Sequence, residues 1–267
     1  LLSIIKKIGY SICFLLYGRI KGVIKSDNHK SVDIIESILD KNYSYKIFKI
    51  KKSRIYTDTV TDTAFIVDNK IIEGPSFQHR NPKNADISEN IVFQKGTPKF
   101  KNKIKGSIFS LLTGGGGNAN YWHWLFDVLP RLKILENKIH SSNIDFYLFP
   151  DLKEKFQKES LDILEIPEKK RLSSRIFRHI ETDLGIAVDH PYVIKNNPSI
   201  EIQNLPNWIL NYLRQKFLKI KYTKKFPDKF YIDRRDAKSN HSHLRKIINE
   251  TEVKEFLITK GYSIIAL

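Results

Sequence analysis

The chain of 267 residues is 41% hydrophobic and 28% charged, which excludes an intrinsically disordered or collagen-like protein. Its net charge of +17 favours anionic partners such as nucleic acid, acidic lipid headgroups and phosphorylated small molecules, although a composition rich in lysine, isoleucine and asparagine produces the same charge without any such partner. The single cysteine, Cys13, excludes an intramolecular disulfide and a multi-cysteine metal site.

The N-terminal segment, residues 1–25, contains an apolar run at 8–17 with lysine and arginine on both sides. This run is too short to cross a bilayer, which takes about 20 residues. Two interpretations stay open: an interfacial helix of a peripheral membrane protein, and an ordinary first helix packed on its domain. The chain has no methionine and ends in an apolar segment at 261–267, so we expect both ends to be cut.

Apolar periodicity in the first half of the chain predicts mainly strands. In chain order we expect a short amphipathic helix at 31–39, strands within 43–56, a hairpin at 63–72 that turns at Asp68-Asn69, a loop region at 74–106, a short strand at 108–112 and a long helix from Asn120.

In the second half of the chain, predicted strands alternate with predicted helices. We expect a strand at 144–149, a helix at 156–164, strands at 175–180 and 184–188, a helix at 208–220, a strand at 230–232, a helix at 247–259 and a strand at 262–267. This alternation is typical of a parallel α/β fold. An aperiodic basic stretch at 221–229 indicates a linker, so we expect one α/β domain at 1–220 and an incomplete second domain at 230–267.

The most informative segment is 113–136, whose sequence is TGGGGNANYWHWLFDVLPRLKILE. Apolar side chains cover nearly the whole circumference of the predicted helix, which indicates burial. His123, Asp127 and Arg131 interrupt this pattern at i, i+4 and i+8, so they share one helix face. Each would cost several kcal/mol if it were buried without a partner.

Two interpretations of this polar stripe stay open. It faces a wet cleft and binds a ligand, with Asp127 as a base or as the group that orients His123. Alternatively, Asp127 pairs internally with Arg131 while His123 bonds to the backbone. Pro130 removes a backbone amide, so we expect the helix to bend or open there. The glycines at 114–117 match neither common phosphate-binding fingerprint and indicate a flexible turn.

Two segments resemble one known family. Residues 120–132, NYWHWLFDVLPRL, resemble the N-terminal signature of the family 61 glycosyltransferases, whose bacterial members include capsular polysaccharide biosynthesis proteins. Residues 231–237, YIDRRDA, and 245–250, RKIINE, with Val253 and Gly261, resemble a second segment of the same family in the same order.

The resemblance implies a GT-B-like architecture, in which two Rossmann-like domains face each other across a cleft. The first domain would bind the acceptor and the second the nucleotide diphosphate sugar, which is the donor substrate. The reaction would be inverting transfer of the sugar to a hydroxyl group. No cofactor is expected, and the absence of a D-x-D triplet means that nothing marks a metal site.

The resemblance also implies roles for particular residues. We expect His123 and Asp127 to be catalytic, and the expected substrate-binding residues are Asn120, Trp122, Arg131, Arg234, Arg235, Asn249 and Glu250. Adjacent arginines after a strand suit a donor diphosphate, because guanidinium groups bind phosphate oxygens in a planar, always-charged geometry. Glu250 equally fits an acidic residue that stabilises the start of a helix.

The expected partners are a nucleotide sugar, a saccharide or glycolipid acceptor and a candidate membrane surface, with no nucleic acid. We expect a cytoplasmic location in a bacterium, peripheral to the inner face of the plasma membrane through residues 1–25. Two alternatives stay open. One is a basic nucleic-acid-binding module, supported only by charge and by aromatic residues interleaved with lysine. The other is a non-catalytic remnant of a glycosyltransferase.

Overall fold

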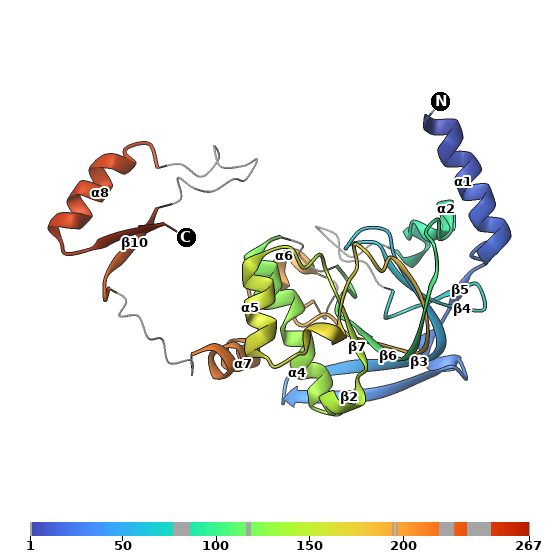
Figure 1. The fold of residues 1–267 in the computed structure, drawn as a ribbon. Coiled ribbons are helices and arrows are strands. Elements are labelled where there is room, and N and C mark those ends of the chain that lie inside the picture. Colours follow the sequence, from blue (N-terminus) through green and yellow to red (C-terminus); the bar gives the residue numbers. More distant parts are fainter. Residues whose placement is uncertain are drawn as a thin grey trace. The chain divides into compact units, whose positions relative to one another are not determined.

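A computed structural model describes residues 2–76, 86–115, 119–193, 195, 197–218, 227–233 and 247–266 (Figure 1). The chain divides into two compact units, Leu1–Lys219 and Ile220–Leu267. The strands of the first unit are β1 (Val23–Ile24), β2 (Val32–Asp40), β3 (Tyr43–Thr57), β4 (Thr63–Val67), β5 (Lys70–Ile72), β6 (Asn102–Ser110), β7 (Phe146–Phe149), β8 (Arg171–Ser173) and β9 (His179–Val188). Its helices are α1 (Leu2–Tyr17), α2 (Val92–Lys95), α3 (Tyr121–His123), α4 (Pro130–Glu136), α5 (Lys155–Ile163), α6 (Pro198–Glu201) and α7 (Asn207–Phe217).

The nine strands form one mixed sheet. Its order is β1-β5-β4-β3-β9-β6-β7-β8, and β2 pairs with β3 outside this path. β9, β6, β7 and β8 run parallel, whereas β3 runs antiparallel to β2, β4 and β9. The fold is therefore mixed α/β, and the parallel arrangement expected from the sequence holds for only part of the sheet. The reason is that short turns connect β2 to β3 and β4 to β5, and short turns join only antiparallel strands.

The predicted helix at 31–39 is wrong, because these residues form β2. Adjacent isoleucines, Ile34 and Ile35, fit a helical period as well as a strand period. The β-branched side chains favour a strand, and pairing with β3 from Val32↔Ile50 onward fixes it. The predicted strand at 175–180 is also wrong for most of its length, because β8 ends at Ser173 and β9 begins at His179.

Most other predicted elements of the first unit are confirmed. The strand at 43–56 is β3, and the hairpin at 63–72 is β4–β5 with positive φ angles of 49° at Asp68 and 55° at Asn69, as a two-residue hairpin turn requires. The predicted helices at 156–164 and 208–220 correspond to α5 and α7. The strand expected at 108–112 begins earlier, at Asn102.

The sheet buries both of its faces. Figure 1 shows α4, α5 and α7 gathered on one side of β3, β6 and β7, and their apolar side chains form one core with that face. The second face packs on itself: Phe65 of β4 and Leu172 of β8, from distant places in the strand order, belong to one buried cluster. The sheet is therefore strongly curled, as twisted sheets of many strands are.

The candidate site is expected beyond the carboxyl ends of β6 and β9. These two strands are parallel neighbours, with Phe109 opposite Ile186. The segment after β6 leads to α3, and the segment after β9 begins at Asp189. Because ligands of open α/β sheets bind beyond the carboxyl ends of strands, these two segments define where a site is expected.

The second unit contains a β-α-β arrangement. β10 (Phe230–Asp233) pairs in parallel with β11 (Ser263–Ala266), and α8 (Glu250–Thr259) lies between them in the chain. The predicted strand, helix and strand are confirmed, although the helix begins at Glu250 rather than at 247. Most of the predicted linker, at 221–226, lies outside the described residues. The expected assignment of acceptor and donor to the two domains stays a prediction.

Candidate functional site

The central helix begins at Asn120. Its side-chain Oδ1 accepts hydrogen bonds from the backbone amides of Trp122 (3.0 Å) and His123 (3.3 Å), which makes it an N-cap. After α3 the helix widens into a π-helical turn at Trp124–Val128, in which the Leu129 amide bonds to the Trp124 carbonyl (3.1 Å). α4 then begins with Pro130, so the predicted opening of the helix near this proline is confirmed.

His123 and Asp127 form a hydrogen-bonded pair. The His123 Nδ1–H donates to Asp127 Oδ2 over 2.6 Å. The His123 side chain is 39% exposed, whereas that of Asp127 is 8% exposed. This hydrogen bond raises the pKa of His123 above its ordinary value of 6.5. The imidazole therefore reaches solvent while the carboxylate behind it fixes its orientation.

Arg131 follows Asp127 by four residues on the central helix, and its side chain is fully buried. Its Nε donates to the Asp127 carbonyl (2.6 Å), and its Nη2 donates to the Gly115 carbonyl (2.9 Å). Gly115 adopts a φ of +97°, which glycine reaches without the steric cost of a side chain. Burial lowers the pKa of Arg131 to about 10, so the guanidinium remains charged at neutral pH. Nη1 has no hydrogen-bond partner among the described residues.

Two residues after β9 complete this cluster, and the sequence did not reveal them. Burial and the neighbouring Asp127 carboxylate both raise the pKa of Tyr192, so its phenol stays protonated. Burial raises the pKa of Asp189, which is close enough to Arg131 for their charges to interact. The parallel pairing of β9 with β6 brings the segments that follow these two strands to the same edge of the sheet, and the sequence does not show this pairing.

Contacts with α7 and β3 hold the segment after β9 in place. The Trp208 Nε1–H donates to the Tyr45 hydroxyl (2.8 Å), which in turn donates to the Pro191 carbonyl (2.8 Å). Tyr45 and Trp208 also pack edge to face. This chain of buried hydrogen bonds fixes the backbone beside Tyr192, so the position of Tyr192 against Asp127 is built into the core.

Trp122 forms an aromatic contact surface beside the His123–Asp127 pair. Its ring packs edge-on against His123 at 5.1 Å and lies 4.9 Å from the Phe126 ring and 6.0 Å from the Tyr192 ring. The side chain is half-buried, so part of it remains accessible next to the exposed imidazole. An accessible aromatic face is a common surface for apolar or ring-shaped ligands.

The second unit contains the remaining predicted site residues that the structure describes. Glu250 accepts a hydrogen bond from the Tyr231 hydroxyl (2.9 Å) and lies 3.5 Å from Lys254, whose ammonium also contacts Asp233 at 2.8 Å. Asn249 donates to Glu252 (3.3 Å). The contacts of Glu250 and Lys254 tie α8 to β10, whereas that of Asn249 stays within the start of α8, so both Glu250 and Asn249 take part in local structure. Arg234 and Arg235 lie outside the described residues.

The structure thus brings five predicted residues together on the central helix: Asn120, Trp122, His123, Asp127 and Arg131. An exposed imidazole supported by a buried carboxylate is an arrangement that accepts a proton from a bound hydroxyl group. Among the described residues, no group of three or more histidine, cysteine, aspartate or glutamate side chains is arranged to bind a metal ion. Likewise, no described helix is long and apolar enough to cross a membrane.

A mixed α/β fold with a histidine–carboxylate pair beyond its parallel strands is compatible with the class of enzymes that work by acid–base catalysis. Comparison with protein families narrows this class. The model of the family Glycosyltransferase 61 matches residues 121–267, which is more than half of the chain and includes His123, Asp127 and the second unit. The chain belongs to the glycosyltransferase 61 family. Its family implies sugar-transferring activity and the binding of a nucleotide-sugar donor and an acceptor.

Two further comparisons were negative. No curated protein matches the chain, and no solved structure matches it.

Proposed function

We propose that this protein is an inverting glycosyltransferase that moves a hexosyl or pentosyl group from a nucleotide diphosphate sugar to a hydroxyl group. The acceptor is a saccharide or glycolipid in the assembly of capsular or other cell-surface polysaccharide, and no cofactor is needed. One observation carries this proposal: the half-exposed His123 imidazole is hydrogen-bonded over 2.6 Å to the buried Asp127.

His123 is the base in this proposal, and Asp127 positions it. The acceptor hydroxyl gives its proton to His123 Nε2 while its oxygen forms a bond to the anomeric carbon of the donor. The bond from that carbon to the diphosphate oxygen breaks on the opposite side, and the diphosphate leaves with the electron pair. Asp127 stabilises the imidazolium through Nδ1. The exposures support this assignment, because the acceptor must reach the base and only His123 is substantially exposed.

The surrounding residues have supporting roles. Arg131 and Tyr192 hold Asp127 in place, and Asp189 interacts electrostatically with Arg131. Trp122 offers its accessible face to a sugar ring of the acceptor. For the donor, we propose that Arg234 and Arg235 balance the charge of the departing diphosphate, as positive charge placed where negative charge develops accelerates such reactions. Asn249 and Glu250, in the same family segment, hold the ends of the elements that carry the donor site.

The proposal includes the wider setting. We propose a GT-B-like arrangement of two Rossmann-like domains, supported by the parallel β-α-β unit that begins at β10. We also propose a cytoplasmic location in a bacterium, with residues 1–25 contacting the plasma membrane. The single cysteine supports a reducing compartment, since it has no partner for an intramolecular disulfide.

The first prediction concerns His123. A panel of nucleotide diphosphate sugars is incubated with the full chain, and release of the nucleoside diphosphate is followed. We expect His123→Ala to lower kcat by about 10²–10⁴-fold, the usual contribution of a positioned base. His140→Ala, which replaces an exposed histidine of the same unit, is the matched control and should retain the wild-type rate. A His123→Ala variant with undiminished kcat would remove His123 from the reaction.

The pH dependence of the same assay separates the two members of the pair. Since the Asp127 hydrogen bond raises the pKa of His123, the wild-type rate should rise with pH to a midpoint above 6.5. Asp127→Asn removes the carboxylate that raises the pKa of His123, whereas burial of His123, which lowers its pKa, remains. The midpoint should therefore move to lower pH, and kcat should fall. A midpoint unchanged by Asp127→Asn would mean that His123 is not the titrating base. Nucleic-acid binding without any nucleotide-sugar turnover would favour the alternative of a basic binding module.

A further inference from the structure

One face of α1 is apolar and exposed. Ile8, Ile12, Leu15 and Leu16 are each more than half exposed, with Leu15 at 87%. Their spacing of four, three and one residues places them on a single helix face. We call these four side chains the α1 stripe. Isolated exposed apolar residues are ordinary on protein surfaces, but a continuous stripe marks a surface that contacts something else.

The opposite side of α1 is fixed to the first unit. The Phe14 ring packs at Gly96, where an added Cβ would lie 2.7 Å from it, and the Arg19 guanidinium covers the same ring at 4.5 Å. The Tyr17 ring meets His179 edge-on at 4.8 Å, and its hydroxyl accepts a hydrogen bond from the Lys101 amide (3.3 Å). Figure 1 shows α1 extending away from the sheet beyond β4 and β5. The helix is therefore anchored at its C-terminal end while the α1 stripe remains uncovered.

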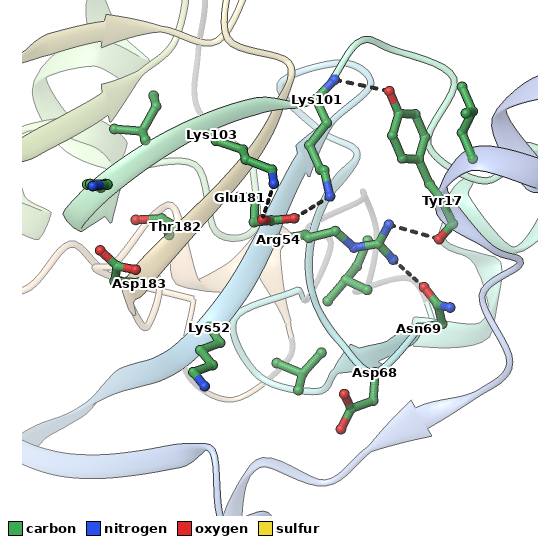
Figure 2. Close-up of a pocket in the computed structure, with 15 residues that line it drawn as sticks. Tyr17, Lys52, Arg54, Asp68, Asn69, Lys101, Lys103, Glu181, Thr182 and Asp183 are labelled. Carbon is green, nitrogen blue, oxygen red and sulfur yellow. Dashed lines mark hydrogen bonds and ion pairs between the residues drawn. The ribbon is translucent and has the colours of Figure 1, made fainter.

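The α1 stripe leads into a cationic pocket. Leu16 and Tyr17 line a pocket of about 620 Å³ whose charged side chains are Lys52, Arg54, Lys101, Lys103, Lys105, Asp68, Glu181 and Asp183. Five of these are cations and three are acids, so the pocket carries a net charge of +2. Figure 2 shows the Lys101 and Lys103 ammonium groups beside Glu181, with the Arg54 guanidinium close by. The stripe and the pocket share Leu16, so they form one surface.

Arg54 is held firmly in that pocket. Its Nη1 donates to the Tyr17 carbonyl (3.1 Å) and its Nη2 to Asn69 Oδ1 (2.6 Å), so it links the end of α1 to the β4–β5 turn. Lys101 is paired with Glu181, whereas Lys103 is 77% exposed and lies 3.8 Å from the same carboxylate. The pocket therefore combines a fixed guanidinium, that of Arg54, with an exposed lysine, Lys103, that can bind an external anion with little desolvation.

The sequence around α1 has a matching charge. Residues 1–26 contain five cations and no acidic residue. The cations are Lys6, Lys7, Arg19, Lys21 and Lys25. A helix with an apolar face and cationic flanks is typical of segments that lie in the interface of a bilayer with acidic lipids.

We propose that the α1 stripe and the cationic pocket together dock this protein on an anionic phospholipid surface. The stripe enters the acyl boundary, and Arg54, Lys103 and Lys105 meet the headgroup phosphates. This inference deepens the proposed membrane contact of residues 1–25 and rests on it. Charge favours this occupant over a second copy of the chain, because a symmetric contact would place two cationic pockets and two sets of basic flanks against each other.

Vesicle flotation with the full chain tests this inference. We expect binding to vesicles that contain about one-third phosphatidylglycerol, weaker binding as salt rises, and little binding to pure phosphatidylcholine. Leu15→Asp with Ile12→Asp should abolish flotation. Lys103→Gln with Lys105→Gln should weaken it by about 25-fold, since each cation near an acidic surface contributes about fivefold.

Matched variants control for general effects. Ile200→Asp replaces an exposed isoleucine on α6, and Lys155→Gln removes an exposed cation on α5, so both should float like the wild type. Equal binding to acidic and neutral vesicles, or flotation that survives Leu15→Asp with Ile12→Asp, would overturn the inference. The inference would also be overturned if, without vesicles, ultracentrifugation found the wild type to be a dimer and the Leu15→Asp with Ile12→Asp variant to be a monomer.

Nucleoside diphosphate release with a soluble acceptor keeps this test separate from the proposed function. We expect the stripe variant to lose vesicle binding with kcat unchanged, and His123→Ala to lose turnover while it still floats. Lack of turnover in the wild type would refute the proposed function and leave the flotation result standing. Lack of flotation in an active wild type would refute the docking surface alone.

Discussion

Two histidines of the first unit occupy opposite environments. His123 is half-exposed, and its hydrogen bond to Asp127 raises its pKa. His179 is fully buried at the start of β9, between the rings of Tyr17 (4.8 Å) and Tyr56 (5.7 Å), and its Nδ1–H donates to the Lys99 carbonyl (3.0 Å). Burial lowers the pKa of His179 to about 4. The first environment suits a base, and the second keeps an imidazole neutral.

The burial of His179 predicts acid sensitivity of the fold. Because its folded pKa of about 4 lies below its ordinary value of 6.5, the unfolded chain binds the extra proton first as pH falls. Stability should therefore drop by about 2 kcal/mol between pH 6.5 and 5, a range above the titration of most carboxyl groups. Urea midpoints measured across this range should fall in the wild type and fall less in His179→Phe. An equal decline in both proteins would assign the acid sensitivity to other groups.

The sequence predicts part of the candidate site at this scale. The i, i+4 spacing of His123 and Asp127 predicted that they share one helix face, but it left open whether Asp127 pairs with His123 or with Arg131. It was not sufficient to predict that Asp127 is buried and His123 exposed. That difference depends on Tyr192 and Arg131, and Tyr192 comes from a segment 65 residues further along the chain. Tertiary packing alone brings such groups together.

The central helix is divided into three parts with different hydrogen-bonding. Asn120 caps α3, the π-helical turn follows at Trp124–Val128, and Pro130 begins α4. α3 is only one turn long, so the cap supplies partners for amides that would otherwise have none. The orientation of His123 therefore depends on Asn120, three residues before it, and on Asp127, four residues after it.

This dependence predicts that Asn120 acts as a cap. Asn120→Ala should cost about 1 kcal/mol of unfolding free energy and lower turnover as the first turn loosens. Asn120→Asp should restore both, because a carboxylate accepts the same two backbone hydrogen bonds. Chemical denaturation and nucleoside diphosphate release measure the two quantities. Restored stability without restored turnover would instead give Asn120 the substrate contact that the family resemblance implied.

Elements were predictable where local signals agreed. The Asp68-Asn69 turn and the start of the helix at Asn120 depend on residues next to each other in sequence, and both were predicted correctly. β2 was missed because its apolar spacing also fits a helix, and only its pairing with β3 decides between them. β9 was predicted as two separate pieces around Asp183, although hydrogen bonds to both neighbouring strands keep it continuous.

The chain divides into two compact units, Leu1–Lys219 and Ile220–Leu267. Among the described residues, all members of the three buried apolar clusters belong to the first unit, and Phe217 is the last described residue packed against them. The second unit has its own parallel pair, β10–β11, and its own polar network around Glu250. The mixed topology of the sheet could not be predicted, because the place of β9 between β3 and β6 joins segments more than 60 residues apart in the chain.

The buried apolar clusters of the first unit predict that this unit folds alone. A chain that ends at Leu218 should unfold cooperatively, with a midpoint within a few degrees of that of the full chain. Nucleoside diphosphates should raise the midpoint of the full chain and leave that of the shortened chain unchanged, because the proposed donor residues lie in the second unit. Thermal unfolding by circular dichroism measures both effects. A shortened chain without a cooperative transition would mean that the first unit needs the second.

The central place of β9 has a consequence for how the protein is made. β3 leaves the ribosome before β9, and one of its edges is not fully paired until Val188 has been synthesised, 131 residues after Thr57. At bacterial and eukaryotic elongation rates this takes roughly 7 to 26 seconds. For that time a long strand rich in isoleucine and tyrosine presents an open edge, so the nascent chain depends on chaperones or on its own lysines to avoid pairing with its neighbours.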